Sequence, residues 1–91
     1  MKSRNGFVSN SSSSSFVIKR KYTTKLQRRL LKNIKEVAEM FDMSCLDWIS
    51  DWDINFGEDV ISGSCFMDNF DMYEFLERIG IDMDQVEYWR N

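Results

Sequence analysis

The sequence predicts an α+β fold, a small and mostly antiparallel sheet with helices on one face. Apolar residues recur at helical spacing over residues 24–41, alternate with polar ones over residues 51–56, and return to helical spacing over residues 70–79. With 91 residues, 43% of them hydrophobic, the chain suits one domain with a single core. We expect a Ser-rich segment over residues 1–15 and a folded core over residues 16–91. The expected order is β-α-β-β-α plus a short C-terminal helix.

The first strand is expected over residues 16–19, and the first helix after Thr24. Thr24 and Gln27 have the spacing of a capping box, in which each side chain bonds the other residue's backbone N–H. An apolar stripe then follows at steps of three or four residues and predicts a core-facing side: Leu26, Leu30, Leu31, Ile34, Val37, Ala38 and Phe41.

Two antiparallel strands are expected next. Trp52, Ile54 and Phe56 alternate with polar residues, which is typical of a half-buried strand. Residues 57–59 predict a turn, and residues 60–66 a returning strand. Gly63, in the middle of that strand, indicates either a bulge or a close approach by another group.

A second helix is expected over residues 70–79, capped by Asp68 or Asn69. Gly80 stands where a left-handed residue commonly ends a helix. Asp82 and Gln85 have the spacing of another capping box, so residues 83–90 are expected to form a last helical turn or two.

Motifs for catalysis and for metal binding are absent from the sequence. With no His, Cys45 and Cys65 cannot form a Cys/His zinc set, and we expect two free, mostly buried thiols in a reducing compartment. The spacing of Asp51, Asp53 and Asn55 resembles that of calcium ligands, but the later Gly and Glu of an EF-hand loop are missing. There is no His to activate a Ser or Cys nucleophile, and no spacing indicates a pair of carboxylates tuned for acid/base work. The sequence therefore predicts a protein that is not an enzyme and has no cofactor.

No leader or membrane segment is expected. A serine run stands where a secretory signal needs an apolar stretch. The apolar runs are far shorter than the roughly 20 residues that span a bilayer. We therefore expect a cytoplasmic protein.

Charge is divided between the two halves of the chain. Residues 1–41 carry ten of the twelve Lys and Arg and two acids, a balance of +8, whereas residues 42–91 carry thirteen acids and two Arg, a balance of −11. The two halves either neutralise each other by packing together, or each meets a charged partner.

The acidic half offers a surface for a protein partner. Its carboxylates could occupy a basic groove on a protein that handles nucleic acid, because they would stand where phosphates normally lie. The candidate partner-binding residues are Asp47, Asp51, Asp53, Glu58, Asp59, Asp68 and Asp71.

The first helix offers the alternative, a nucleic-acid-binding face. Each phosphate that such a face neutralises adds salt-dependent affinity. At about 100° per residue, five basic residues fall within roughly 120° of arc opposite the apolar stripe: Lys25, Arg28, Arg29, Lys32 and Lys35.

The N-terminal stretch carries a resemblance. Five serines, residues 11–15, stand in a string that includes Arg4, Gly6, Phe7, Val8, Ser9, Asn10 and Phe16. This string resembles the start of many small phage and bacterial proteins that share no established activity. The resemblance implies a phage-type accessory origin. The stretch itself is a modification site, an address read by another factor, or a hairpin whose serines line a sheet edge; we favour the address or recognition element.

The sequence as a whole predicts a non-enzymatic phage-type accessory protein that binds a host or phage protein through its acidic surface. Modulation of a nucleic-acid machine or of a defence system is the role expected for such binding. The alternatives are a nucleic-acid-binding module that uses the basic helix face, and a minor virion component.

Overall fold

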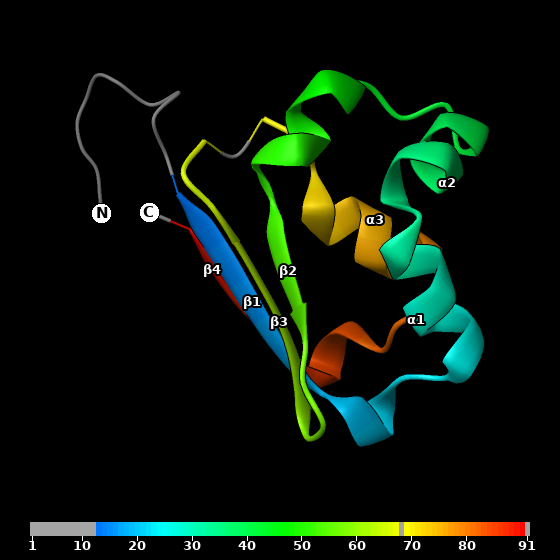
Figure 1. The fold of residues 1–91 in the computed structure, drawn as a ribbon, viewed down its shortest axis with the longest axis vertical. Helices are drawn as coiled ribbons and strands as arrows, with labels where there is room; N and C mark the ends of the chain where they lie inside the picture. Colours follow the sequence, from blue (N-terminus) through cyan, green and yellow to red (C-terminus); the bar gives the residue numbers. More distant parts are fainter. Residues whose placement is uncertain (1–12, 68, 91) are drawn as a thin grey trace.

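The structure, a computed structural model, describes residues 13–67 and 69–90. A four-stranded antiparallel sheet forms one layer, in the order β2-β3-β1-β4 (Figure 1). Its strands are β1 (Ser14–Lys19), β2 (Asp53–Phe56), β3 (Val60–Cys65) and β4 (Val86–Arg90).

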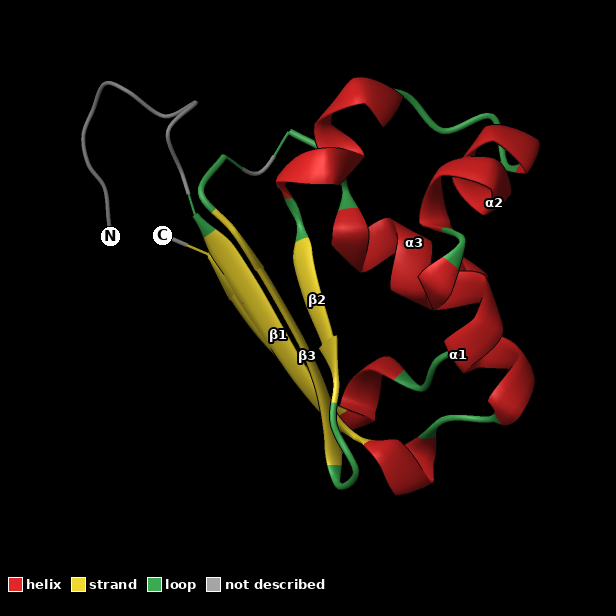
Figure 2. Ribbon diagram, viewed as in Figure 1, coloured by secondary structure: helices red, strands yellow, loops and turns green. Residues whose placement is uncertain are grey.

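The helices form a second layer on one face of the sheet (Figure 2). They are α1 (Lys25–Lys32), α2 (Ile34–Met40) and α3 (Met72–Arg78). Three short 3-10 turns connect elements: η2 (Arg20–Tyr22), η3 (Leu46–Asp51) and η4 (Met83–Gln85). The predicted α+β class, with helices on one side of a small antiparallel sheet, is confirmed.

Two β-α-β units interlock in this topology. Because every neighbouring pair of strands is antiparallel, β1 and β2 run parallel to each other with β3 between them. In the same way β3 and β4 run parallel with β1 between them. This is the split β-α-β arrangement, in which each helical crossover spans one inserted strand.

The strand register separates the two faces of the sheet. Phe16 of β1 lies opposite Gly63 on one side and Tyr88 on the other, and Ile18 lies opposite Ile61. These side chains face the helices and meet the apolar sides of α2 and α3 in one core. Its fully buried large side chains are Phe16, Ile18, Leu31, Ile61, Phe70, Met72, Phe75 and Leu76.

The C-terminal segment is a strand, so the prediction of a last helix was wrong. The Asp82 carboxylate accepts a hydrogen bond from the Asp84 N–H at 3.0 Å, but the turn that it caps ends at Gln85. From Val86 onward the chain is extended and pairs with β1. The ladder to β1 satisfies backbone groups that a short isolated helix would leave to water.

The first helix is also interrupted, at Asn33. The capping box is present as predicted, with Gln27 N–H donating to Thr24 Oγ1 at 3.0 Å and Thr24 N–H donating to Gln27 Oε1 at 2.9 Å. Asn33 adopts φ −115° and ψ 43°, and its side chain donates to the Arg29 carbonyl. The break separates α1 from α2, and Leu26, expected in the core stripe, is 61% exposed.

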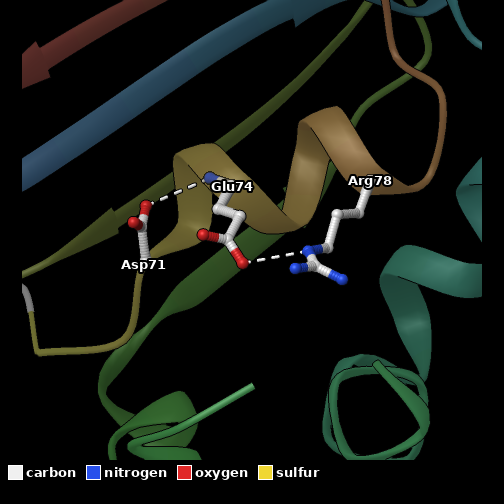
Figure 3. A network of polar contacts seen from close by, with 3 residues as sticks. All are labelled: Asp71, Glu74 and Arg78. Atoms are coloured by element: carbon white, nitrogen blue, oxygen red, sulfur yellow. Dashed lines mark hydrogen bonds and ion pairs between the residues drawn. The ribbon is translucent and has the colours of Figure 1, made fainter. Parts of the chain in front are cut away.

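Helix α3 begins at Met72, two residues later than expected. Asp71, and not Asn69, accepts from the Glu74 N–H at 3.0 Å (Figure 3). Glu74 and Arg78 then form an i,i+4 ion pair of 2.9 Å along the exposed side of the helix (Figure 3). Beyond the helix, Gly80 has φ 91°, the left-handed conformation that its position predicted.

Other boundaries shift by one or two residues. Strand β1 begins at Ser14 instead of Phe16, and Ser14 is 3% exposed. Both Ser14 and Ser15 lie on a strand with neighbours on either side, and so not at an edge of the sheet. Asp51 belongs to η3 and β2 starts at Asp53.

The other face of the sheet carries mostly small and polar residues, with Trp89 at one edge. Its outward side chains on the central strands β1 and β3 include Ser15, Val17, Ser62 and Ser64. The edge strands add Asp53, Asn55, Glu87 and Trp89. Among the described residues, no element covers this face (Figure 1).

Candidate anion-binding site

The basic side chains of α1 gather around one hollow. It has a volume of about 340 Å³, and every described residue that lines it is either basic or an amide. We name it the basic hollow, and its lining is Arg20, Lys25, Arg28, Arg29, Lys32 and Asn33.

Helix periodicity places four of these residues on one side of α1. Lys25, Arg28, Arg29 and Lys32 are separated by three, four and seven positions, which puts them on adjacent turns of the same face. Leu31, on the opposite side, is 2% exposed and anchors the helix in the core. The buried stripe therefore fixes the direction in which the basic face points.

Arg20 joins the hollow from a different element. It is the first residue of η2, directly after β1, and its backbone N–H donates to the Asp59 carbonyl at 2.9 Å. Its guanidinium Nη1 donates to the Gly57 carbonyl at 3.3 Å. These bonds tie η2 to the turn between β2 and β3 and so hold Arg20 beside the start of α1.

Arg28 is the most constrained of the basic residues. Its Nη1 donates to the Thr23 carbonyl at 3.0 Å and to Thr23 Oγ1 at 2.9 Å. Neither Arg20 nor Arg28 forms an ion pair with a carboxylate in the part of the chain that the structure describes. Their positive charges are oriented by neutral acceptors and stay available for an anion.

The predicted residue Lys35 lies outside the basic hollow. It follows the break at Asn33 and lines a neighbouring groove that also reaches Lys32 and Asn33. Lys32 stands between the two, with its Nζ 5.2 Å from the centre of the Phe56 ring. The structure therefore brings together four of the five predicted basic residues.

The acidic residues do not form one surface. Asp51 and Asp53 lie at the start of β2, whereas Glu58 and Asp59 lie beyond its other end. Asp47 is exposed on η3. Asp71 caps α3 (Figure 3), and it pairs with Arg90 at 3.5 Å. Asp68 lies outside the described residues.

Among the described residues, acids of the second half of the chain meet basic residues of the first half at the turn between β2 and β3. Glu58 and Asp59 line a hollow of about 540 Å³ together with Lys19, Arg20, Lys21 and Arg28. These two acids and four basic residues therefore lie on one surface at the turn between β2 and β3. This juxtaposition offsets part of the positive charge beside the basic hollow.

Asp51 and Asp53 lie beside exposed aromatic side chains. Together with Ser13, Ser14, Ser15, Ser64 and Cys65, they line a hollow of about 440 Å³ that Phe66 and Trp89 complete. Phe66 is 88% exposed and Trp89 is 49% exposed. We name this place the acidic-aromatic hollow.

The N-terminal recognition stretch falls largely outside the described residues. Arg4, Gly6, Phe7, Val8, Ser9 and Asn10 lie there. Phe16, its last member, is fully buried in the sheet, where its ring stacks on that of Tyr88 at 6.3 Å between centres. Phe16 is therefore a residue of the hydrophobic core.

Three site residues were not predicted. Arg20 stands in the run Lys19-Arg20-Lys21 just before the helix cap, and this run was the signal available for it. The sequence pattern predicts Phe66 at the end of a strand and Trp89 in a C-terminal helix, and only the tertiary structure shows that both are exposed beside the same hollow.

The cysteines differ in exposure. Cys65 is buried on β3, as expected, but Cys45 is exposed. Cys45 has φ 61° and lies immediately before η3, outside the core. The prediction of two mostly buried thiols is therefore wrong for Cys45.

Within residues 13–67 and 69–90, no three His, Cys, Asp or Glu side chains come together as metal ligands would. None of the helices in those residues is both long enough and apolar enough to cross a membrane. In comparisons with known proteins, no family model, no curated protein and no solved structure matches this chain.

Proposed function

We propose that the protein binds nucleic acid through the phosphate backbone, with the basic hollow as its contact surface. The observation that carries the proposal is the convergence of five cationic side chains from η2 and α1 on one hollow. Two of them, Arg20 and Arg28, are oriented by neutral acceptors. Guanidinium and ammonium groups arranged in this way suit phosphate oxygens.

The rest of the surface favours recognition of the backbone over recognition of bases. A sheet that stacks bases needs aromatic side chains on its open face. The outward residues on the central strands include Ser15, Val17, Ser62 and Ser64, and the aromatic side chain that the described strands add to this face, Trp89, lies on the edge strand β4. Binding is therefore expected to depend strongly on salt and weakly on sequence.

The test compares two charge reversals of equal size. Arg29 lies in the basic hollow and Lys35 lies outside it, and both side chains are exposed. Arg29→Glu should weaken binding of a fluorescein-labelled 12-nucleotide strand about tenfold at 100 mM KCl, whereas Lys35→Glu should change it less than about threefold, because exposed charges are screened over roughly 10 Å at that salt concentration. Arg28 is unsuited to this comparison, since its bonds to Thr23 support the fold locally.

Fluorescence anisotropy over a series of KCl concentrations gives the result. With about three phosphates neutralised, log K should fall with log salt at a slope of roughly −2 to −3. Equal effects of the two variants, or affinity that does not depend on salt, would contradict the proposal.

A second candidate function is binding of a basic protein through the acidic-aromatic hollow. The exposure of Phe66 and Trp89 beside Asp51 and Asp53 favours it. Exposed aromatic side chains commonly anchor protein interfaces, and the carboxylates would steer a basic partner. This is the protein-partner hypothesis of the acidic half, restricted to the two acids that share a hollow with aromatics.

The measurement is an affinity pull-down from lysate with nuclease present, comparing the wild-type protein with a Phe66→Ser/Trp89→Ser variant. A partner that binds the wild type and is lost from the variant would support this second function. A set of captured proteins that is the same for both would count against it.

A further inference from the structure

A groove opens beside the edge strand β2, on the helix side of the sheet. It has a volume of about 460 Å³ and runs between this strand and the junction of α1 with α2. Its apolar wall is formed by Leu31, Ile34, Ile49, Trp52, Ile54 and Phe56, and Lys32, Asn33, Lys35 and Glu36 complete it. We name it the edge groove.

Strand β2 ends the sheet on this side. It pairs with β3 along residues 53–56 and, in the described part of the chain, with no other strand. An edge strand presents backbone N–H and C=O groups that can pair with another extended chain. Ile54 and Phe56, which face the helices, are only half-buried.

The indole of Trp52 gives a second indication at the same place. Trp52 is 6% exposed, lines the edge groove, and has no hydrogen-bond partner for its buried Nε1–H among the described residues. A buried donor without an acceptor costs about 1–3 kcal/mol. Trp52 therefore lines the groove and also carries a buried polar group, beneath the groove surface, that the described chain leaves unsatisfied.

Charge at the groove is mostly positive. Lys32 and Lys35 flank it, with Glu36 as the single acid in its lining. Neither lysine has an ion-pair partner among the described residues. An occupant that carries a carboxylate next to an apolar stretch would complement both the wall and the lysines.

We propose that the edge groove takes an extended segment of a partner protein, which pairs with β2 as an added strand. Alternate side chains of the segment would be apolar and enter the groove, and a carboxylate at its flank would meet Lys35. The intervening side chains would stand on the outer face beside Asp53 and Asn55, where neutral or basic residues suit them. The segment is short, because β2 has four residues.

This proposal is independent of nucleic-acid binding. The edge groove and the basic hollow share Lys32 and Asn33, but Arg29 lines only the hollow and Lys35 lines only the groove. Arg29→Glu should therefore weaken nucleic-acid binding more than peptide binding, and Lys35→Glu should weaken peptide binding more than nucleic-acid binding.

The experiment selects peptides from a random 12-residue display library on the full-length protein and measures the enriched peptides by titration. Enriched sequences should alternate apolar and other residues over about four positions and carry a flanking Asp or Glu. Lys35→Glu should weaken their binding at least fivefold, and Arg29→Glu should change it less than twofold. In amide NMR spectra the largest shifts should fall on residues 53–56.

Two controls keep the result interpretable. Ile54→Asp should abolish binding, and Val17→Asp, on the outer face of β1 and two strands away from β2, should preserve it; an unfolding curve of each variant shows whether it is folded. Methylation of alternate peptide nitrogens should block binding in one register and leave it intact in the other, since only one set of amides faces β2.

Three outcomes would overturn the proposal. The first is a peptide selection in which no sequence is enriched on the wild-type protein relative to the Lys35→Glu protein. The second is a set of shifts confined to the outer face of the sheet or to α3. The third is a 12-nucleotide strand that shifts the amides of Ile54 and Phe56 more than any peptide, which would assign the groove to a nucleic-acid base.

Discussion

Gly63 on β3 lies directly opposite Phe16 on β1, and a Cβ atom added to Gly63 would stand 2.5 Å from Phe16 Cε2. The same atom would stand 3.0 Å from Ile54 Cδ1. The Phe16 ring is fully buried, so it has no free space into which it can move. Of the two interpretations of Gly63, the close approach is confirmed, and the register runs through the residue without a bulge.

Gly63→Ala is therefore expected to destabilise the protein. Overpacking of a filled core costs about 1–3 kcal/mol in the free energy of unfolding, and urea denaturation followed by Trp fluorescence measures it. Ser62→Ala, on the outer face of the same strand, is the matched control and should stay within about 0.5 kcal/mol. A Gly63→Ala protein as stable as the wild type would show that the ring does not occupy this position.

The capping box of α1 gives a second prediction. Thr24→Ala removes the oxygen that accepts from the Gln27 N–H and should lower the free energy of unfolding by about 1 kcal/mol. Thr24→Ser keeps the hydroxyl and should cost much less. Thermal unfolding followed by circular dichroism separates the two variants, and equal losses would argue against the cap.

Asp71 has two roles that substitution can separate. Asp71→Ala removes the cap of α3 and should cost about 1 kcal/mol. Asp71→Asn keeps an acceptor for the Glu74 N–H but loses the ion pair with Arg90, which is solvent-exposed on both sides and contributes little. In urea unfolding, the wild type and Asp71→Asn should therefore have similar free energies of unfolding, and Asp71→Ala should have a lower one. The reverse order would assign the stability to the ion pair.

The cysteines predict a difference in thiol reactivity. Cys45 is exposed and Cys65 is 6% exposed, so in the native protein a thiol reagent should modify Cys45 first. Cys65 should react at the rate at which the sheet opens, and quickly in denaturant. Mass spectrometry of the labelled peptides over time measures both. Equal native rates would mean that the end of β3 is open to solvent.

Local patterns were sufficient for most of the fold. The capping box at Thr24, the turn after Phe56 and the left-handed Gly80 were all predicted, because each depends on residues close in sequence. The C-terminal strand was not, since Asp82 supplies a genuine helix-type cap and five extended residues give a weak period-two signal. Residues 86–90 form a strand because they pair with the side of β1 that β3 does not occupy, and β1 lies far away in the sequence.

The candidate site divides in the same way. Helix periodicity placed Lys25, Arg28, Arg29 and Lys32 on one face, and the structure keeps them together. Lys35 is separated because Asn33 breaks the helix, and a break set by one residue's φ and ψ leaves the apolar spacing on both sides unchanged. The acidic residues were grouped by nearness in sequence, whereas strand β2 carries them to opposite ends of the sheet.

Strand order has a consequence for synthesis of the chain. Of the four described strands, β1 is synthesised first and β4 last, yet in the sheet β1 stands between β3 and β4. A nascent chain that lacks residues 86–90 leaves one side of β1 without its hydrogen-bond partners. Pairing between residues so distant in sequence is slow to form. The sheet is therefore completed only after its final strand has left the ribosome, and until then β1 offers an open edge to chaperones or to other chains.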